Sequence, residues 1–439
     1  MSENLLFLLS GLLILAPIIA YLINRKYFYY SLIILYPVIG QLIDIKVTIL
    51  GLALNPSMIF GLVVLAFTAL DFFMLPSRQR VLEVSIVMFI TYLMASAFFS
   101  PTRGDSISWS MKIATWLLML AVSTKLFTEK QDLIQLFFVT SVAVMIVILS
   151  FTFSKLGYYG KSITYETGVK LYGGGFKSGK SMAYYLAIAL PVLAIVGLDK
   201  RQVARPLAWL LAVVSLAVIV LTFVRSPIIA LLVGFMVFQY FSARYVQKDL
   251  KKMVVWLVAI AVIIVAAFYF LEDSEYTSRW RELGDKYSAG KVEKLGSGRI
   301  GGLMGFYEYY IHKASLPKKI FGSGFGASHV FLGTGVLIHN DFAEIILGCG
   351  VIGIALYMMI FVCLFRSLRG LLQKRFLKEF HLPVILALCS FFMLLSFHMT
   401  NISSGVFILS VWSMHVGATV GIGDRLARSS DAAIRVELR

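Results

Sequence analysis

Ile338-His339-Asn340-Asp341-Phe342-Ala343-Glu344 joins a long polar segment of this chain, 272–337, directly to an apolar segment, 341–365. Outward from this junction, in both directions, the sequence is mostly a succession of apolar runs. Runs of roughly 17–25 apolar residues are long enough to cross the hydrocarbon core of a bilayer. The polar segment is therefore predicted to be a large loop between membrane-spanning helices, with its histidine where the loop enters the membrane.

The composition indicates a membrane protein. Of the 439 residues, 59% are hydrophobic and only 14% are charged, whereas about a quarter of the residues in soluble domains are charged. No alternation with a period of two suggests a barrel, so the predicted fold class is all-α. We expect one polytopic domain, 1–439, with about 12 or 13 membrane-spanning helices and one large loop, 272–340, before the last three. The predicted spans are 4–23, 27–43, 55–75, 81–100, 109–127, 133–153, 182–198, 207–224, 228–242, 253–271, 341–365, 382–399 and 405–421.

The net charge of +17 is attributed to membrane topology and not to nucleic-acid binding, because no nucleic-acid-binding motif accompanies it. Short loops that carry Lys and Arg are predicted to face the cytoplasm, and the opposite loops, including 272–340, to face away from it. The basic residues of the cytoplasmic side are Arg78, Arg80, Lys200, Arg201, Arg205, Lys248, Lys251, Lys252, Arg366, Arg369, Lys374, Arg375, Lys378, Arg425, Arg428, Arg435 and Arg439.

The sequence shows no metal motif and no disulfide framework. The cysteines, Cys349, Cys363 and Cys389, all lie in apolar runs, and no HExxH, DxD or carboxylate cluster is present. We therefore expect neither a metal nor another cofactor.

The segment 174–181 (GGFKSGKS) matches the spacing of an ATP-binding P-loop. A P-loop follows a buried strand in an α/β domain, whereas here a membrane helix follows and the loop is predicted to lie outside the cytoplasm. ATP binding is therefore rejected. Glycines and lysines before a helix can still hold a phosphate, which makes Lys177 and Lys180 candidate diphosphate ligands. The alternative is a solvated loop.

Arg225 stands in a tight turn between two apolar runs. A guanidinium group there could bind a phosphate through two hydrogen bonds, or it could extend to lipid headgroups. Arg299, at the end of Gly296-Ser297-Gly298-Arg299, is a second candidate ligand. Arg279 and Arg281 are weaker candidates, because arginines in loops are usually solvated.

His339 is the candidate catalytic base, because imidazole can accept a proton near neutral pH. Asn340 adjoins it, and Glu344 lies one helical turn further on, where it could orient the histidine or bind a sugar hydroxyl. His398, at the outer end of the span 382–399, is a candidate lining residue. The alternative for His339 is a structural, hydrogen-bonding histidine.

These motifs together resemble the O-antigen ligase and O-antigen polymerase superfamily of bacterial envelope enzymes. His339-Asn340, followed after nine residues by Gly350-Val351-Ile352-Gly353, resembles the signature of that superfamily. The glycine-rich segment 321–326 (FGSGFG), Arg225 in 222–226 (TFVRS) and Ser297-Gly298-Arg299 resemble its other motifs. Many members have Ser-Arg-Gly where this chain has Arg225-Ser226-Pro227, and an arginine near the position of Lys177.

The resemblance implies a glycosyltransferase of the inner membrane that acts at the periplasmic face and inverts the sugar configuration. The donor would be a glycan on undecaprenyl diphosphate, and the acceptor lipid A-core for a ligase or another lipid-linked glycan for a polymerase. His339 would be the base, and Arg225, Arg299, Lys177 and Lys180 would bind the diphosphate. Membrane lipids are further expected partners, and a polymerase would also work with a chain-length regulator.

Two other classes remain open at the level of sequence. A lipid-linked oligosaccharide flippase would also need arginines for a diphosphate, although its site is expected between two similar halves, and no half-repeat is visible. A structural partner in envelope assembly is the third interpretation. The motif around His339 favours the ligase type.

Overall fold

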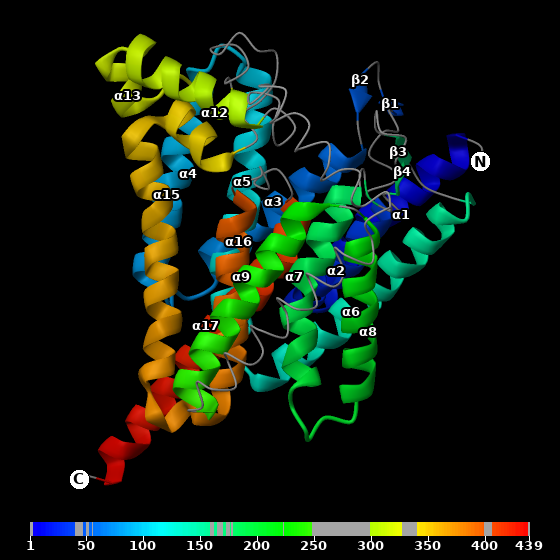
Figure 1. Ribbon diagram of the computed structural model, residues 1–439, viewed down its shortest axis with the longest axis vertical. Helices are drawn as coiled ribbons and strands as arrows, with labels where there is room; N and C mark the ends of the chain where they lie inside the picture. The colour runs from blue at the N-terminus through cyan, green and yellow to red at the C-terminus, as the bar shows by residue number, and fades with distance from the viewer. Residues whose placement is uncertain are drawn as a thin grey trace, which may run out of the picture.

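The computed structural model describes residues 3–39, 47–49, 52–54, 56–158, 162–164, 170–172, 176, 179–222, 224–247, 299–326, 340–398 and 406–437. These residues form a bundle of long helices with a smaller helical layer at one end (Figure 1). The long helices are α1 (Glu3–Ile23), α2 (Arg25–Ile39), α3 (Pro56–Met74), α4 (Arg80–Phe98), α5 (Arg103–Leu126), α6 (Lys130–Lys155), α7 (Gly179–Gly197), α8 (Arg205–Leu221), α9 (Arg225–Ser242), α15 (Asp341–Gln373), α16 (His381–His398) and α17 (Val406–Glu437).

Short elements complete the described chain. The helices α12 (Arg299–Glu308) and α13 (Leu316–Phe321), joined by the π-helical turn η4 (Tyr309–Lys313), form the end layer. A second π-helical turn, η2 (Ala243–Gln247), extends α9, and a 3₁₀-helix, η5 (Arg375–Phe380), precedes α16. The strands pair only within two antiparallel hairpins, which are β1 (Val47–Ile49) with β2 (Leu52–Leu54), and β3 (Ser162–Thr164) with β4 (Lys170–Tyr172).

The helical membrane architecture expected from the sequence is confirmed. Within the described residues, seven helices are long and apolar enough to cross a membrane, namely α4, α5, α6, α7, α9, α15 and α16 with their flanking turns. Every predicted span except 253–271, which lies outside the described residues, overlaps an observed helix. The total of 12 or so spans stays a prediction, as does the placement of 272–340 outside the cytoplasm. Within the predicted loop 272–340, the described residues form α12, η4 and α13.

Several observed helices extend beyond the predicted spans. α15 continues to Gln373 and α17 to Glu437, well beyond the predicted ends at 365 and 421, and α5 begins at Arg103 within a predicted loop. The apolar run marks only the part of a helix that lies in hydrocarbon, whereas a helix with charged residues on an exposed face can continue into water. The two hairpins had no expected counterpart in the sequence.

α17 occupies the centre of the bundle, and its residues 408–423 are buried on every side. It packs along α5, whose residues 113–125 are also buried. Gly417 lies against Ser123, and Gly421 against the carbonyl oxygen of Thr124. Small residues four positions apart let two helices approach closely, which is how helices associate where no water drives them together. The four-residue spacing of these glycines therefore seats α17 on α5.

Charged side chains are buried where helix ends meet. The ammonium group of Lys125 lies 3.0 Å from Oε2 of Glu83 and donates to the carbonyl oxygen of Phe72 at 2.8 Å. The ammonium group of Lys26, whose side chain is partly exposed, lies 2.6 Å from Oδ1 of the buried Asp132. A buried charge is costly unless it is paired. The Lys125–Glu83 pair therefore ties the end of α5 to the start of α4, and the Lys26–Asp132 pair ties the start of α2 to the start of α6.

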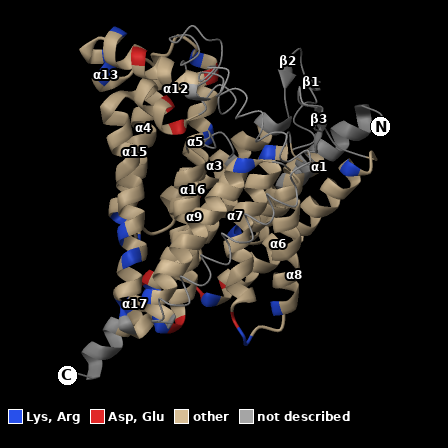
Figure 2. Ribbon diagram, viewed as in Figure 1, with Lys and Arg blue, Asp and Glu red and all other residues tan. Residues whose placement is uncertain are grey.

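The same end of the bundle carries many of the basic residues that the sequence assigns to the cytoplasmic side (Figure 2). We call it the basic end, marked by Arg78, Lys374, Arg425 and Arg428. Nη2 of Arg428 donates to the carbonyl oxygen of Arg78 at 3.1 Å, and Nη1 of Arg425 donates to Oγ1 of Thr128 at 3.0 Å. These bonds join α17 to the turns before α4 and α6. The opposite end, where α9 and α15 begin and α16 finishes, is called the site end below.

A backbone break at Gly350 bends α15 near the site end. Gly350 has φ 67° and ψ −167°, and the first segment of α15 crosses the top of the bundle before the helix turns down (Figure 1). A Cβ atom at Gly350 would overlap the carbonyl oxygen of Ile320, and one at Gly322, where φ is 90°, would overlap that of Gly348. The two glycines therefore allow α13 and the bent helix to touch through bare backbone.

The bend frees backbone carbonyls of α15, and neighbouring groups satisfy them. The amide of Ser323 donates to the carbonyl oxygen of Leu347 at 2.9 Å, and the amide of Gly324 to that of Gly348 at 3.0 Å. Oγ of Ser96 also donates to the carbonyl oxygen of Gly348, at 2.7 Å. Freed backbone groups at membrane depth require such partners. The glycine-rich segment 321–326 thus takes over hydrogen bonds that the helix loses.

Replacement of Gly350 by Ala is expected to lower the apparent Tm of the purified protein in detergent. An alanine in this conformation is strained by about 1–3 kcal/mol, and its Cβ also overlaps the carbonyl oxygen of Ile320. Intrinsic fluorescence during heating measures the shift. Gly305→Ala is the matched control, because a Cβ there meets open space within α12. Equal Tm values for the two variants would contradict the role assigned to the bend.

Candidate functional site

The start of α15 is buried and capped by its own sequence. Oδ1 of Asn340 accepts a hydrogen bond from the amide of Ala343 at 3.1 Å, which satisfies one of the free amides at the helix start. Asp341 and Glu344 lie in the first turn, where negative charge is favoured by the helix dipole. All three polar side chains are buried. The residue that immediately precedes this cap is His339.

Asp341, His398 and Tyr357 form a buried network that connects α15 to α16. Nδ1 of His398 lies 2.7 Å from Oδ2 of Asp341, and Nε2 lies 3.0 Å from the hydroxyl oxygen of Tyr357. The side chains of His398 and Asp341 are only 0% and 1% exposed. In the tautomer that carries its proton on Nδ1, His398 donates a hydrogen bond to the carboxylate of Asp341, and Nε2 accepts a hydrogen bond from the hydroxyl of Tyr357.

The bend at Gly350 makes this network possible. In a straight helix the Cα atoms of Asp341 and Tyr357 would stand about 24 Å apart, at 1.5 Å per residue. One imidazole ring and two short hydrogen bonds do not cover that distance. Because the first segment of α15 folds back across the bundle, the carboxylate of Asp341 reaches the ring that Tyr357 also contacts.

A second set of contacts at the site end joins α7, α9 and α16. The hydroxyl oxygen of Tyr184 lies 2.7 Å from Oγ of Ser226, the residue after Arg225. The ring of Tyr184 packs on Phe397 with 4.6 Å between centroids, and the ammonium group of Lys180 lies 5.5 Å from the centroid of the Tyr184 ring. Phe397 directly precedes His398 in α16, so these contacts are next to the Asp341 network along the chain.

The structure therefore brings together some of the predicted site residues. Lys180 begins this chain of contacts, Arg225 is the first residue of α9, and Asn340 and His398 lie in or beside the buried network. Glu344 is buried one turn into α15 and does not line an open surface. His398, predicted as a lining residue, is wholly buried, and each of its ring nitrogens lies within hydrogen-bond distance of a side chain.

Other predicted residues are located only in part. Arg299 is the first residue of α12, and its side chain is outside the described residues, as are His339, Lys177, Arg279 and Arg281. α12 and η4 pack on the first segment of α15, where Phe306 and Tyr309 contact Ala343 and Leu347. The element that begins with Arg299 is thus held against the helix that begins after His339.

The end layer is stabilised by its own contacts. The hydroxyl of Tyr310 donates to the carbonyl oxygen of Lys319 at 2.9 Å, and partial burial raises the pKa of Tyr310. The ammonium group of Lys313 lies 2.7 Å from Oε1 of Glu308, and this contact lowers the pKa of the Glu308 carboxyl. α12, η4 and α13 therefore form a unit that rests on α15.

Sequence reasoning did not find Tyr357 and treated Asp341 only as a neighbour of the histidine. The sequence does contain a clue, because Asp341 and Tyr357 are polar residues on either side of the Gly350-Val351-Ile352-Gly353 motif within one apolar run. Among the described residues, no group of three His, Cys, Asp or Glu side chains could hold a metal ion.

Neither a family model nor a curated protein matches this chain.

A double-mutant cycle is expected to detect strong coupling between Asp341 and His398. Asp341→Ala or His398→Ala alone leaves a buried polar partner without its hydrogen bond, which costs about 3 kcal/mol. The double variant removes both groups, so its loss of stability is expected to be smaller than the sum by at least about 1 kcal/mol. Denaturant unfolding in detergent measures the four proteins. His312→Ala, on an exposed position of η4, is the control, and strictly additive losses would contradict the network.

Proposed function

We propose that this chain is a membrane glycosyltransferase of the O-antigen ligase type. It transfers a glycan from undecaprenyl diphosphate to a hydroxyl of lipid A-core at the periplasmic face of a bacterial inner membrane. The Asp341–His398–Tyr357 network carries the proposal. It holds the start of α15, and hence the backbone next to His339, at helix ends that also carry Lys180 and Arg225.

The proposed reaction is a single displacement. His339 accepts the proton of the acceptor hydroxyl while the hydroxyl oxygen forms a bond to the anomeric carbon of the donor glycan. The bond from that carbon to the diphosphate oxygen breaks in the same step, and undecaprenyl diphosphate leaves with the electron pair. Attack opposite to the leaving group inverts the configuration. The donor is already activated, so no nucleotide takes part.

Cationic side chains bind and stabilise the departing diphosphate. Arg225 and Arg299 supply guanidinium groups that match two phosphate oxygens, and Lys177 and Lys180 add positive charge. Fixed positive groups at the point where charge develops can replace a metal ion in this role. Because the leaving group is a lipid, the site must lie at the edge of the bilayer, and the position of Lys180 and Arg225 in the first turns of α7 and α9 supports this.

The buried residues act by positioning. The Asn340 cap sets the direction in which the chain enters α15, and the Asp341–His398 hydrogen bond ties that entry to the end of α16. His398 is wholly buried and does not exchange protons with an acceptor in this arrangement. Glu344 supports the first turn from inside. The reacting base is therefore assigned to His339 and not to His398.

Transfer in a defined mixture tests the proposal. The purified chain in lipid nanodiscs is incubated with a lipid-linked glycan and either lipid A-core or a second lipid-linked glycan. One glycan block on lipid A-core is the expected product. A lengthening series on the lipid-linked acceptor would instead identify a polymerase. Movement of the donor between leaflets of a proteoliposome without any new glycosidic bond would identify a transporter and overturn the proposal.

His339→Ala is expected to bind donor with nearly unchanged affinity while product formation falls by about 10²-fold or more, since the general base is lost. His312→Ala, which removes an exposed imidazole from the end layer, should retain activity. Initial rates at saturating donor make the comparison. Full product formation by the His339 variant would show that His339 is not the general base.

Arg225→Lys keeps the charge but loses the two-point contact with phosphate, so kcat/KM is expected to fall about tenfold. Arg244→Lys is the matched control, because Arg244 lies at the opposite end of the same helical segment and donates to the hydroxyl of Tyr240. The expected activity of this control equals that of the parent protein.

Chelation of divalent ions with EDTA should leave the rate of the parent protein unchanged.

A further inference from the structure

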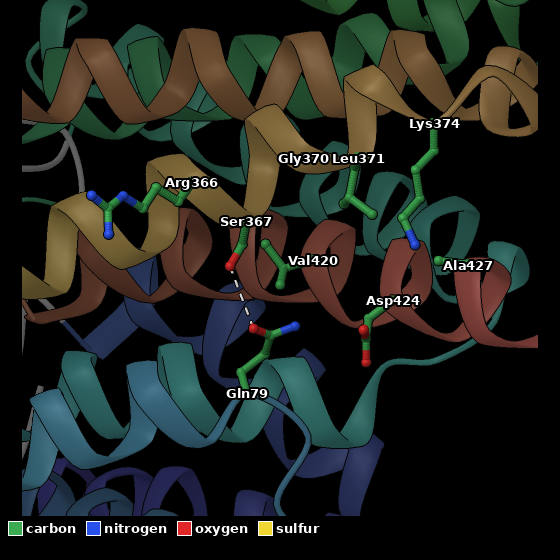
Figure 3. A pocket seen from close by; sticks show the side chains of 9 residues that line it. All are labelled: Gln79, Arg366, Ser367, Gly370, Leu371, Lys374, Val420, Asp424 and Ala427. Carbon is green, nitrogen blue, oxygen red and sulfur yellow. Dashed lines mark hydrogen bonds between the residues drawn. The ribbon is translucent and has the colours of Figure 1, made fainter. Parts of the chain in front are cut away.

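A cavity opens at the basic end between the residue before α4, the last turns of α15 and residues 420–427 of α17 (Figure 3). Its volume is about 190 Å³, enough for several water molecules at about 30 Å³ each. Polar and charged lining residues are Gln79, Arg366, Ser367, Lys374 and Asp424, and Gly370 forms part of the wall. In the view of Figure 3, Arg366 stands at one end and Lys374 at the other.

The cavity offers more donors than acceptors. The Arg366 guanidinium forms an ion pair with no carboxylate among the described residues. Oγ of Ser367 donates to Oε1 of Gln79 at 3.4 Å, which leaves the amide nitrogen of Gln79 as a further donor. Oδ2 of Asp424, the acidic group of the lining, lies 2.7 Å from Nη2 of Arg428. A cavity with this balance of charge favours an anion.

An apolar stripe on α15 leads to the cavity from the membrane side. Met358 and Val362 are large side chains that remain exposed, at 38% and 43%, and they precede Arg366 at steps of four residues. Residues four apart lie on the same helix face. An acyl chain that lies along Met358 and Val362 would bring its phosphate to Arg366. This continuity favours a lipid over a soluble phosphate.

We propose that this cavity binds the phosphate of an anionic phospholipid, with one acyl chain along the exposed stripe of α15. Clusters of basic residues at the cytoplasmic end of membrane helices attract anionic lipids, at about 1 kcal/mol for each Lys or Arg. Arg366 and Lys374 are about 12 Å apart along the helix axis, at 1.5 Å per residue. In Figure 3 the guanidinium of Arg366 points away from the other lining residues and the ammonium of Lys374 points toward Asp424, so Arg366 meets the headgroup at the rim of the cavity and Lys374 meets it at the other end. The site lies at the opposite end of the bundle from the proposed catalytic residues.

Binding is tested on the full chain in a neutral detergent by native mass spectrometry. Short-chain phosphatidylglycerol is the probe, and phosphatidylcholine with the same acyl chains is the neutral comparison. Phosphatidylglycerol is expected to bind at least about fivefold more tightly than phosphatidylcholine, and inorganic phosphate at the same concentration should not displace it. Equal affinity for the two lipids, or displacement by inorganic phosphate, would overturn the assignment of a lipid site.

Three variants distinguish the contribution of positive charge from that of the open cavity volume. Arg366→Gln and Lys374→Gln should each weaken phosphatidylglycerol binding about fivefold, which corresponds to about 1 kcal/mol. Gly370→Leu keeps every charge but fills the cavity, and a Cβ at this position meets no neighbouring atom within 4 Å, so the variant should fold and lose binding. Leu also favours a helix more than Gly does.

Arg369→Gln is the control for net charge, because Arg369 is exposed on the same helix and does not line the cavity. It should retain the affinity of the parent protein. A loss in Arg369→Gln as large as that in Arg366→Gln would show attraction to the whole basic end and not to this cavity. Unchanged binding by a correctly folded Gly370→Leu protein, as judged by its Tm, would also refute the proposed location.

Discussion

The backbone of Gly350 packs directly against the backbone of residues 320–322, and the arrangement of the site end depends on this contact. A helix in a membrane normally keeps all of its backbone hydrogen bonds, since lipid offers no replacement. α15 gives up some of these bonds at Gly350, and the glycine-rich segment and Ser96 supply the missing donors. No side chain fits between the two backbones, so glycine is required on both sides. The bend is thus part of the fold and not a local distortion.

The bend creates a polar connection between helices that are distant in sequence. Asp341 and His398 are separated by 57 positions, and their hydrogen bond is wholly buried. A carboxylate and an imidazole in a low-dielectric interior are costly when separated, and the cost is offset only when their hydrogen bonds are complete. The buried Lys125–Glu83 pair at the basic end obeys the same rule. Paired polar side chains therefore help to fix both ends of the bundle.

Hydropathy is a good guide to the helices of this chain and a poor one to the contacts between them. It predicts a helix for each apolar run, because a helix in lipid needs an apolar surface. It also predicts that Arg225 and Asn340 lie near the starts of α9 and α15, as observed. It could not place the ends of α15 and α17, since those turns continue as charged helix beyond the apolar run. A histidine at the outer end of a span suggests a residue that faces a cavity, whereas the bend of α15 covers His398 with Asp341. That outcome depends on the positive φ of Gly350, which hydropathy does not encode.

The bend and the buried network stabilise each other, and this mutual dependence bears on any chemistry at residue 339. If α15 straightened, Asp341 would withdraw from His398, and two buried polar groups would lose their partners at a cost of several kcal/mol. If the Asp341–His398 bond were absent, straightening would be opposed by the backbone contacts of the segment 322–324, by the Ser96 hydrogen bond and by the packing of α12 and η4. A base that must stand within hydrogen-bond reach of an acceptor needs a fixed backbone, because small displacements cost large factors in rate. A flexible loop cannot supply that on its own. The helix that begins just after Asn340, the neighbour of His339, is held both by the Asp341–His398 bond and by the backbone contacts at Gly350, and this is the physical reason to seek the reacting group at its start.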